Sequence, residues 1–194
     1  TKGTGGNLSI YNREMELMAI SPSGMDYFEI TPRDIVILDL KGNIVDGDKK
    51  PSTEYEMHKI FYEKREDINA IIHTHTVFAT TISCLNQPLP AIHYMIALAG
   101  EDIRCARYAS YGTKELAINA YKAMKDRKAV LLANHGLLAG SRDLAGAFNI
   151  TEQVEYCAEL YYRAKSIGEP VILSKDEMKI MLKRFNTYGQ VGSD

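Results

Sequence analysis

The chain has 194 residues, of which 45% are hydrophobic and 25% charged, as in globular proteins with a substantial core. The net charge of -2 leaves no basic surplus to neutralise phosphates, so we expect no nucleic-acid partner. No apolar run is long enough to span a bilayer, and we expect no membrane partner. The spacing of Cys84, Cys105 and Cys157 is not that of a metal site, which predicts reduced, mostly buried thiols in a cytoplasmic protein.

Short apolar runs and longer amphipathic segments alternate along the chain without an internal repeat, so we predict a single domain over residues 1–194. The apolar runs predict strands at residues 8–11, 16–20, 35–40, 68–75, 129–133 and 137–139. The amphipathic segments predict helices that begin near Ser52 or cover residues 77–85, 113–125, 143–166 and 175–184. Tight turns join several of the strands. The fold class is therefore α/β, with a mostly antiparallel or mixed sheet covered by helices on both faces.

The chain begins at Thr1 and not at a methionine, so we expect further residues upstream, including an N-terminal helix. Ser52 or Thr53 is expected to cap the first helix, because hydroxyl side chains accept hydrogen bonds from unpaired N–H groups at helix starts. Residues 185–194 follow the last predicted helix and are polar, which predicts a mobile C-terminal tail.

Three histidines follow apolar strands. Side chains two positions apart on a strand share a face, so the imidazoles of His73 and His75 can meet one ion. His135 follows another buried run and precedes Gly136, which allows close backbone approach. Catalytic zinc sites usually take three protein ligands and leave one position open. The alternative is three unrelated histidines that each make a hydrogen bond, which is the role we assign to His58 and His93.

Hydroxyl and glycine residues occur in three predicted turns. Residues 51–54 open a helix, where unpaired N–H groups and the helix dipole favour an anion. Residues 3–7 form a glycine-rich loop, and residues 21–24 a second turn with two hydroxyls. Each turn alone is equally well explained as an ordinary cap or turn. Together they predict a phosphorylated substrate.

Glu54 lies next to this predicted anion site. A glutamate near a metal-bound carbonyl compound can transfer the proton on the adjacent carbon, if burial holds its pKa near the working pH. The alternative is a solvated glutamate that complements the helix dipole. The neighbouring motifs favour the role of acid and base.

Five of these segments resemble, in order, the class II zinc-dependent sugar-phosphate aldolases: residues 3–9 (GTGGNLS), 21–24 (SPSG), 51–54 (PSTE), 73–75 (HTH) and 134–136 (NHG). Within that family, three further segments resemble the L-fuculose-1-phosphate aldolases: residues 90–97 (PAIHYMIA), 108–113 (YASYGT) and 185–189 (FNTYG). The resemblance spans nearly the whole chain and implies the fold of that family, which the adducin head shares.

The resemblance implies roles for individual residues. One Zn²⁺ per subunit would be bound by His73, His75 and His135, with Glu54 as the acid and base. The substrate phosphate would be held by Asn7, Ser23, Gly24, Ser52 and Thr53. Tyr94 would reach a neighbouring subunit's site and stabilise or protonate the aldehyde oxygen, and Tyr188 would help to close the site and select the aldehyde. The implied assembly is a homotetramer with active sites between subunits.

Three positions depart from the family pattern. Ser23 stands where threonine is usual and Thr53 where serine is usual, and both keep the hydroxyl. Tyr111 stands where the L-fuculose-1-phosphate aldolases have phenylalanine, which could alter the aldehyde pocket.

The implied activity is reversible cleavage of L-fuculose 1-phosphate to dihydroxyacetone phosphate and L-lactaldehyde, in carbohydrate catabolism. Alternatives on the same fold are a rhamnulose-1-phosphate aldolase, a ribulose-phosphate 4-epimerase and a methylthioribulose-phosphate dehydratase. The epimerases tend to have aspartate at the position of Glu54, whereas the dehydratases share the glutamate and differ in residues 92–97. A further alternative is a non-catalytic module like the adducin head, which predicts lost metal ligands. The sequence leaves open the exact sugar and the metal loaded, because imidazole also suits other divalent ions.

Overall fold

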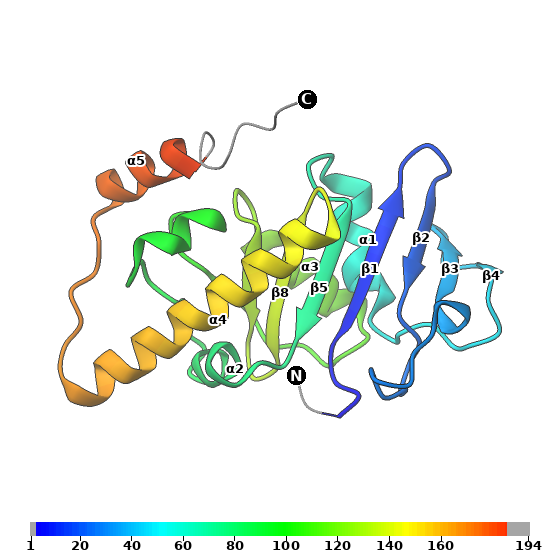
Figure 1. The fold of residues 1–194 in the computed structure, drawn as a ribbon, viewed down its shortest axis with the longest axis horizontal. Coiled ribbons are helices and arrows are strands. Elements are labelled where there is room, and N and C mark those ends of the chain that lie inside the picture. Colours follow the sequence, from blue (N-terminus) through cyan, green and yellow to red (C-terminus); the bar gives the residue numbers. More distant parts are fainter. Residues whose placement is uncertain (1–2, 186–194) are drawn as a thin grey trace.

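The computed structural model describes residues 3–185, which fold around one eight-stranded sheet (Figure 1). Its strand order is β4-β3-β2-β1-β5-β8-β7-β6. The strands are β1 (Asn7–Asn12), β2 (Leu17–Ile20), β3 (Val36–Asp39), β4 (Ile44–Asp46), β5 (Ala70–Thr74), β6 (Cys105–Ala106), β7 (Ala129–Leu132) and β8 (Gly136–Ser141). Within this sheet, β6 and β7 are parallel and the other neighbouring strands are antiparallel. The predicted mostly antiparallel sheet is confirmed.

The described residues also form five α-helices and two short 3-10 helices, of which α4 and α5 follow the last strand. They are η1 (Pro32–Asp34), α1 (Tyr55–Lys64), α2 (Val77–Ser83), η2 (Tyr94–Leu98), α3 (Lys114–Ala123), α4 (Leu144–Ile167) and α5 (Lys175–Phe185). All five predicted α-helices are present. The last helix also contains Phe185, the first residue of the predicted tail, and residues 186–194 lie outside the described residues.

The predicted cap of α1 is wrong. Glu54 is the N-cap residue of α1, and no side chain makes the capping hydrogen bond. The Ser52 hydroxyl instead accepts a hydrogen bond from the Glu54 N–H, 3.3 Å away. The helix thus begins one or two residues later than a cap at Thr53 or Ser52 would predict. Glu54 is the residue that immediately precedes its first turn.

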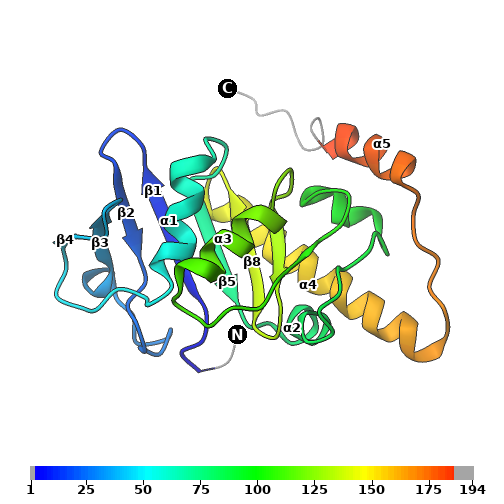
Figure 2. The same cartoon turned by 180° about the vertical axis from the view of Figure 1, so that it is seen from behind.

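The helices cover the sheet from two sides, as Figures 1 and 2 show. On one side, Phe61 of α1 and Leu116 of α3 belong to a buried cluster with Ile71 of β5. On the other side, α2 and α4 pack over β8 and β7, and α5 packs on η2. Cover on this second side is partial, since Ile10 of β1 is half-exposed.

The expected burial of the cysteines is only partly right. All three lie in the described part of the chain as free thiols, but Cys84 is exposed, Cys105 is half-buried and only Cys157 is buried. Among residues 3–185, no helix combines the length and apolar character needed to cross a membrane.

Because β5 runs through the middle of the sheet, loss of a side chain there should weaken the whole fold. Ile71 is fully buried, and we expect Ile71→Ala to lower the free energy of unfolding by about 2–5 kcal/mol through lost burial and the cavity left behind. Urea denaturation measures the change. Ile118→Ala is the matched control, because Ile118 is exposed on α3 and its loss should change stability by only about 0.5 kcal/mol. Equal losses in the two variants would contradict this account of the core.

Candidate active site

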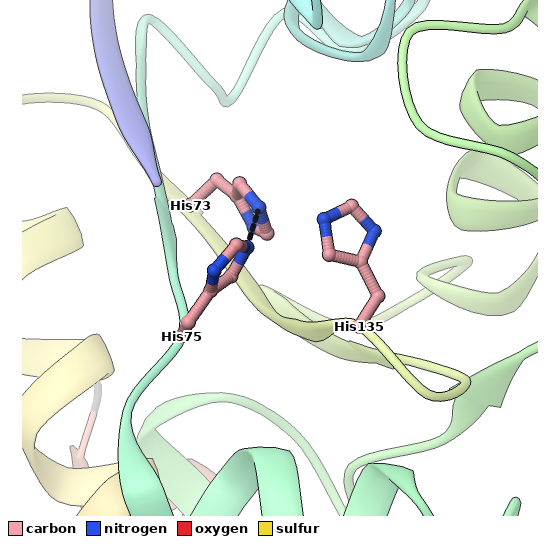
Figure 3. Close-up of side chains that lie close together, drawn as sticks. All are labelled: His73, His75 and His135. Carbon is pink, nitrogen blue, oxygen red and sulfur yellow. Dashed lines mark hydrogen bonds between the residues drawn. The ribbon is translucent and has the colours of Figure 1, made fainter. Parts of the chain in front are cut away.

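Three histidines meet beside the ends of two neighbouring strands (Figure 3). His73 is in β5, His75 lies just beyond it, and His135 is in the turn between β7 and β8. One ring nitrogen of each lies within 4.8 Å of those of the other two. The Nε2 atoms of His73 and His75 are 3.0 Å apart, close to the roughly 3.3 Å expected for two nitrogen ligands of one tetrahedral zinc ion. The sequence-predicted cluster is therefore brought together.

His73 is held in one tautomer and in its neutral form. Its Nδ1 lies 2.9 Å from the carbonyl oxygen of Leu137, which can only accept, so Nδ1 carries the proton and Nε2 keeps its lone pair. Burial lowers the pKa of His73 well below its usual value, and the nearby His135 and His75 rings lower it further. Burial also lowers the pKa of His75. Neutral imidazole with a free lone pair is the form that binds metal.

Two glycines allow the strands to approach this site closely. A Cβ at Gly6 would lie 2.5 Å from the backbone oxygen of His73, and the φ of +83° already disfavours other residues. A Cβ at Gly136 would lie 2.4 Å from the backbone oxygen of Thr74 and 3.0 Å from the His75 ring. Glycine at both positions therefore lets neighbouring backbone lie against the segment that carries the first two histidines.

The Glu54 carboxylate borders the histidines and is only 7% exposed. Its Oε2 accepts a hydrogen bond from Asn7 Nδ2 at 3.0 Å and lies 3.3 Å from His73 Nε2. Its Oε1 lies 3.5 Å from His135 Nε2 and has no hydrogen-bond partner within the described residues. One carboxylate oxygen is thus fixed, and the other is buried and available.

A cavity of about 310 Å³ opens beside Glu54, His75 and His135. All of the residues predicted to bind phosphate line it: Asn7, Ser23, Gly24, Ser52 and Thr53. Backbone contacts bring two of the predicted turns together, because Ser52 N donates to Ser21 O at 3.1 Å and Ser23 N to Lys50 O at 2.8 Å. Tyr108, Tyr111 and Asn134 also line the cavity, and the two tyrosines are exposed.

Of the two predicted tyrosines, the structure describes only Tyr94, which does not line this cavity. Tyr94 lies in η2, is 47% exposed, and stacks on Phe185 of α5 with 6.2 Å between the ring centroids. It is not among the described residues that line the cavity. Tyr188 lies outside the part of the chain that the structure describes. His93, which we expected to be structural, accepts a hydrogen bond from Met95 N at the start of η2.

His58 is more closely connected to the site than the sequence indicated. It is fully buried on α1, its Nε2 lies 2.5 Å from Asn7 Oδ1, and its Nδ1 lies 2.7 Å from Ser9 Oγ. Asn7 therefore links His58 to Glu54, because its side chain is hydrogen-bonded to both. A signal was present, because Glu54 and His58 are four positions apart and share one face of a helix.

This arrangement has the chemistry of a metal-dependent enzyme site. The three imidazole nitrogens form the donor set that suits zinc and similar divalent ions. Beside them lies a buried carboxylate oxygen with no hydrogen-bond partner among residues 3–185. The adjoining polar cavity can admit a small molecule, as catalytic metal sites require.

Comparison with known proteins places the chain in a family. The family described as the class II aldolase and adducin N-terminal domain matches residues 1–162. The 5-deoxy-D-ribulose 1-phosphate aldolase of Bacillus thuringiensis serovar kurstaki is 56% identical over 190 residues, covering 98% of this chain and 89% of that protein. An L-fuculose phosphate aldolase of Escherichia coli O6:H1 is 44% identical, covering 97% of this chain and 87% of that protein.

A solved structure named L-fuculose 1-phosphate aldolase superimposes with a TM-score of 0.94 at 61% identity, covering 96% of this chain and 88% of that one. The chain thus belongs to the class II aldolase and adducin N-terminal domain family, within which it is an aldolase, an enzyme of the lyase class. The predicted fold and enzyme class are confirmed. The non-catalytic alternative predicted decayed ligands, whereas all three histidines are present.

The close approach of Gly6 to β5 gives a test of how the site is built. We expect Gly6→Ala to push the His73 backbone aside and to weaken binding of one divalent metal ion by about tenfold or more, as when outer supports of metal ligands are removed. Gly3→Ala is the matched control, because Gly3 has φ +59° in the same loop but open space where the Cβ would lie. Competition with a metal-binding dye measures the affinity. Unchanged affinity in Gly6→Ala would show that the contact does not support the site.

Proposed function

We propose that this protein catalyses reversible aldol cleavage of L-fuculose 1-phosphate to dihydroxyacetone phosphate and L-lactaldehyde. The single observation that carries the proposal is the buried Glu54 carboxylate, which lies between the three histidines and a cavity lined by hydroxyl and glycine residues. The solved L-fuculose 1-phosphate aldolase that is 61% identical supports this choice of sugar.

We propose that the metal is one Zn²⁺ per subunit, held by His73, His75 and His135. Three imidazole ligands would leave a coordination position open for substrate, as catalytic zinc sites do. A bound divalent cation would supply Lewis acidity, which stabilises negative charge on the substrate's oxygens when the carbon–carbon bond breaks.

The proposed phosphate site is the part of the cavity around the start of α1. Backbone N–H groups at a helix start have no partner inside the helix, and the helix dipole there attracts an anion. Ser23 and Thr53 are exposed and can turn their hydroxyls to a ligand, and Gly24 leaves open space beside them. Asn7 and Ser52 complete the set from the buried side.

Glu54 is proposed to transfer the proton at the substrate carbon next to the carbonyl. Its Oε2 is held by Asn7, whereas its Oε1 has no hydrogen-bond partner among the described residues. In the cleavage direction Glu54 would give a proton to that carbon, and in the condensation direction it would remove one. A carboxyl group held at a fixed position is a common general acid and base in enzymes.

A second substrate, 5-deoxyribulose 1-phosphate, is favoured by the relative that is 56% identical and is named for it. Both sugars are ketose 1-phosphates that yield dihydroxyacetone phosphate, so the buried half of the site would treat them alike. The two sugars differ in the aldehyde that is released. The exposed Tyr108 and Tyr111, which line the cavity, are the residues that would contact this aldehyde portion.

The assembly and location remain proposals. We propose a homotetramer in which Tyr94 serves a neighbouring subunit's site, supported by its half-exposed ring and its position away from its own chain's cavity. Tyr188 is proposed to close the same site, and the protein is proposed to be cytoplasmic.

The activity itself can be tested with a panel of sugar phosphates. We expect dihydroxyacetone phosphate to be released from L-fuculose 1-phosphate or 5-deoxyribulose 1-phosphate, and release to stop in the presence of a chelator and return with added Zn²⁺. Coupled reduction of dihydroxyacetone phosphate measures the rate. Rhamnulose 1-phosphate, ribulose 5-phosphate and methylthioribulose 1-phosphate complete the panel. Epimerised or dehydrated products with no dihydroxyacetone phosphate would replace the proposal with one of the alternatives.

The role of Glu54 predicts a specific loss. Glu54→Gln keeps the size of the side chain and a hydrogen-bonding oxygen but removes the acid and base, so we expect zinc content to persist and kcat to fall by roughly 10²–10⁴-fold. Metal analysis and steady-state kinetics measure the two effects. The role would be refuted by near-full turnover in the metal-loaded variant.

A further inference from the structure

A chain of buried hydrogen bonds runs from Glu54 into the core on the α1 side of the sheet. Asn7 Nδ2 donates to Glu54 Oε2 at 3.0 Å, and Asn7 Oδ1 meets His58 Nε2. His58 Nδ1 meets Ser9 Oγ at 2.7 Å, and that hydroxyl meets Tyr62 Oη at 2.5 Å. All five side chains are buried, with His58 and Ser9 fully so.

The chemistry of the groups fixes the direction of this chain. A carboxylate oxygen only accepts, so the amide nitrogen of Asn7 faces Glu54 and its amide oxygen faces His58. That oxygen also only accepts, so His58 carries its proton on Nε2. Burial lowers the pKa of His58 to about 3, which keeps the ring neutral and leaves Nδ1 as an acceptor. Ser9 therefore donates to His58, and Tyr62 donates to Ser9.

We propose that His58 is a positioning residue for the reaction: its Nε2–H holds the Asn7 amide in the one orientation that can fix Glu54. The inference rests on the proposed role of Glu54 in proton transfer. With the amide turned over, its oxygen would face the Glu54 carboxylate, and two acceptors would repel each other. Because Asn7 holds Oε2, the network also sets the position of Oε1, which accepts no hydrogen bond from the described residues.

Asn7 also lines the cavity, so the same amide can serve both halves of the site. One of its two N–H groups is used by Glu54, and the other is available to a substrate oxygen. His58 would thus set the carboxylate relative to the bound sugar phosphate without touching either one. Placement errors of this kind are costly, since a shift of about 1 Å in a reacting group can cost on the order of a hundredfold in rate.

The test compares two amides at position 58. A glutamine places its side-chain nitrogen near the position of His58 Nε2 and keeps a donor to Asn7, whereas an asparagine is too short to reach. We expect His58→Gln to keep kcat within about threefold and His58→Asn to lower kcat by roughly ten- to a hundredfold, with a smaller change in KM. Zinc content and thermal unfolding are measured on both. A merely structural histidine predicts similar losses of stability in the two variants and no selective loss of kcat.

Wild-type kcat in a folded His58→Asn variant, or equal loss in the two variants, would overturn the inference. Tyr62→Phe is the control in the same network, because Ser9 can still donate to His58 after the phenol is removed. We expect its kcat to stay within about twofold of the wild-type value. The Glu54→Gln variant distinguishes failure of the proposed function from failure of the role of His58. Full activity of Glu54→Gln would contradict the proposed function. Loss of activity in Glu54→Gln, together with full activity in His58→Asn, would contradict only the role of His58.

Nitrogen-15 NMR of the wild-type protein tests the same network without any variant. The proposal requires the His58 ring to be neutral, with the proton on Nε2 and a bare Nδ1, and the two nitrogens have well-separated resonances in that tautomer. Spectra are compared with those of His58→Gln to assign the ring. A proton on Nδ1, or rapid exchange between tautomers, would overturn the inference even if the asparagine variant fails to fold.

Discussion

The antiparallel pairing of β5 with β8 sets the geometry on which the site depends. His73 lies opposite Leu138 and Thr74 opposite Leu137, so the end of β5 meets the start of β8 just after His135. The Leu137 carbonyl then accepts from His73 Nδ1 and turns the other ring nitrogen toward the neighbouring imidazoles. One histidine in β5, one just beyond its end and one from a distant turn thereby meet, and the register of the β5–β8 pair determines that they do. A slip of one residue would turn His73 to the opposite face.

The electrostatics of the site follow from this burial. Removal from water disfavours charge on the imidazoles, and each additional ring strengthens the effect on its neighbours, so the pKa of His73 falls well below its usual value. His73 and His75 are thereby kept neutral and offer lone pairs at physiological pH, when solvated histidines would be partly protonated. The carboxylate of Glu54 supplies negative charge beside them, which favours a cation at the same place. The proposed metal ligands thus lie in β5, just beyond it and in the turn between β7 and β8, while other turns at the edge of the sheet hold the proposed phosphate site.

The sequence predicted those parts of the fold and site that repeat at a short spacing. Strand alternation placed His73 and His75 on one face, and helical periodicity found all five α-helices. It did not find β4, which has three exposed residues, or β6, which has two residues, because neither is long enough to show an alternating pattern. It misplaced the cap of α1, because Ser52 is held by the backbone of Ser21 and its hydroxyl serves Glu54 instead. The link of His58 to Asn7 depends on the pairing of β1 with β5, a contact between distant segments that no local pattern contains.

The division between buried and exposed parts of the site explains how relatives named for different sugars can share it. The groups proposed to bind metal and transfer the proton are held by the sheet, by α1 and by a network of buried side chains, so they tolerate little change. The remaining wall of the cavity includes Tyr108 and Tyr111, both largely exposed on a loop between β6 and α3. Exposed loop residues can be replaced at small cost in stability. Preference for one aldehyde over another is therefore free to vary at this wall, while the chemistry that forms and breaks the carbon–carbon bond stays fixed by the core.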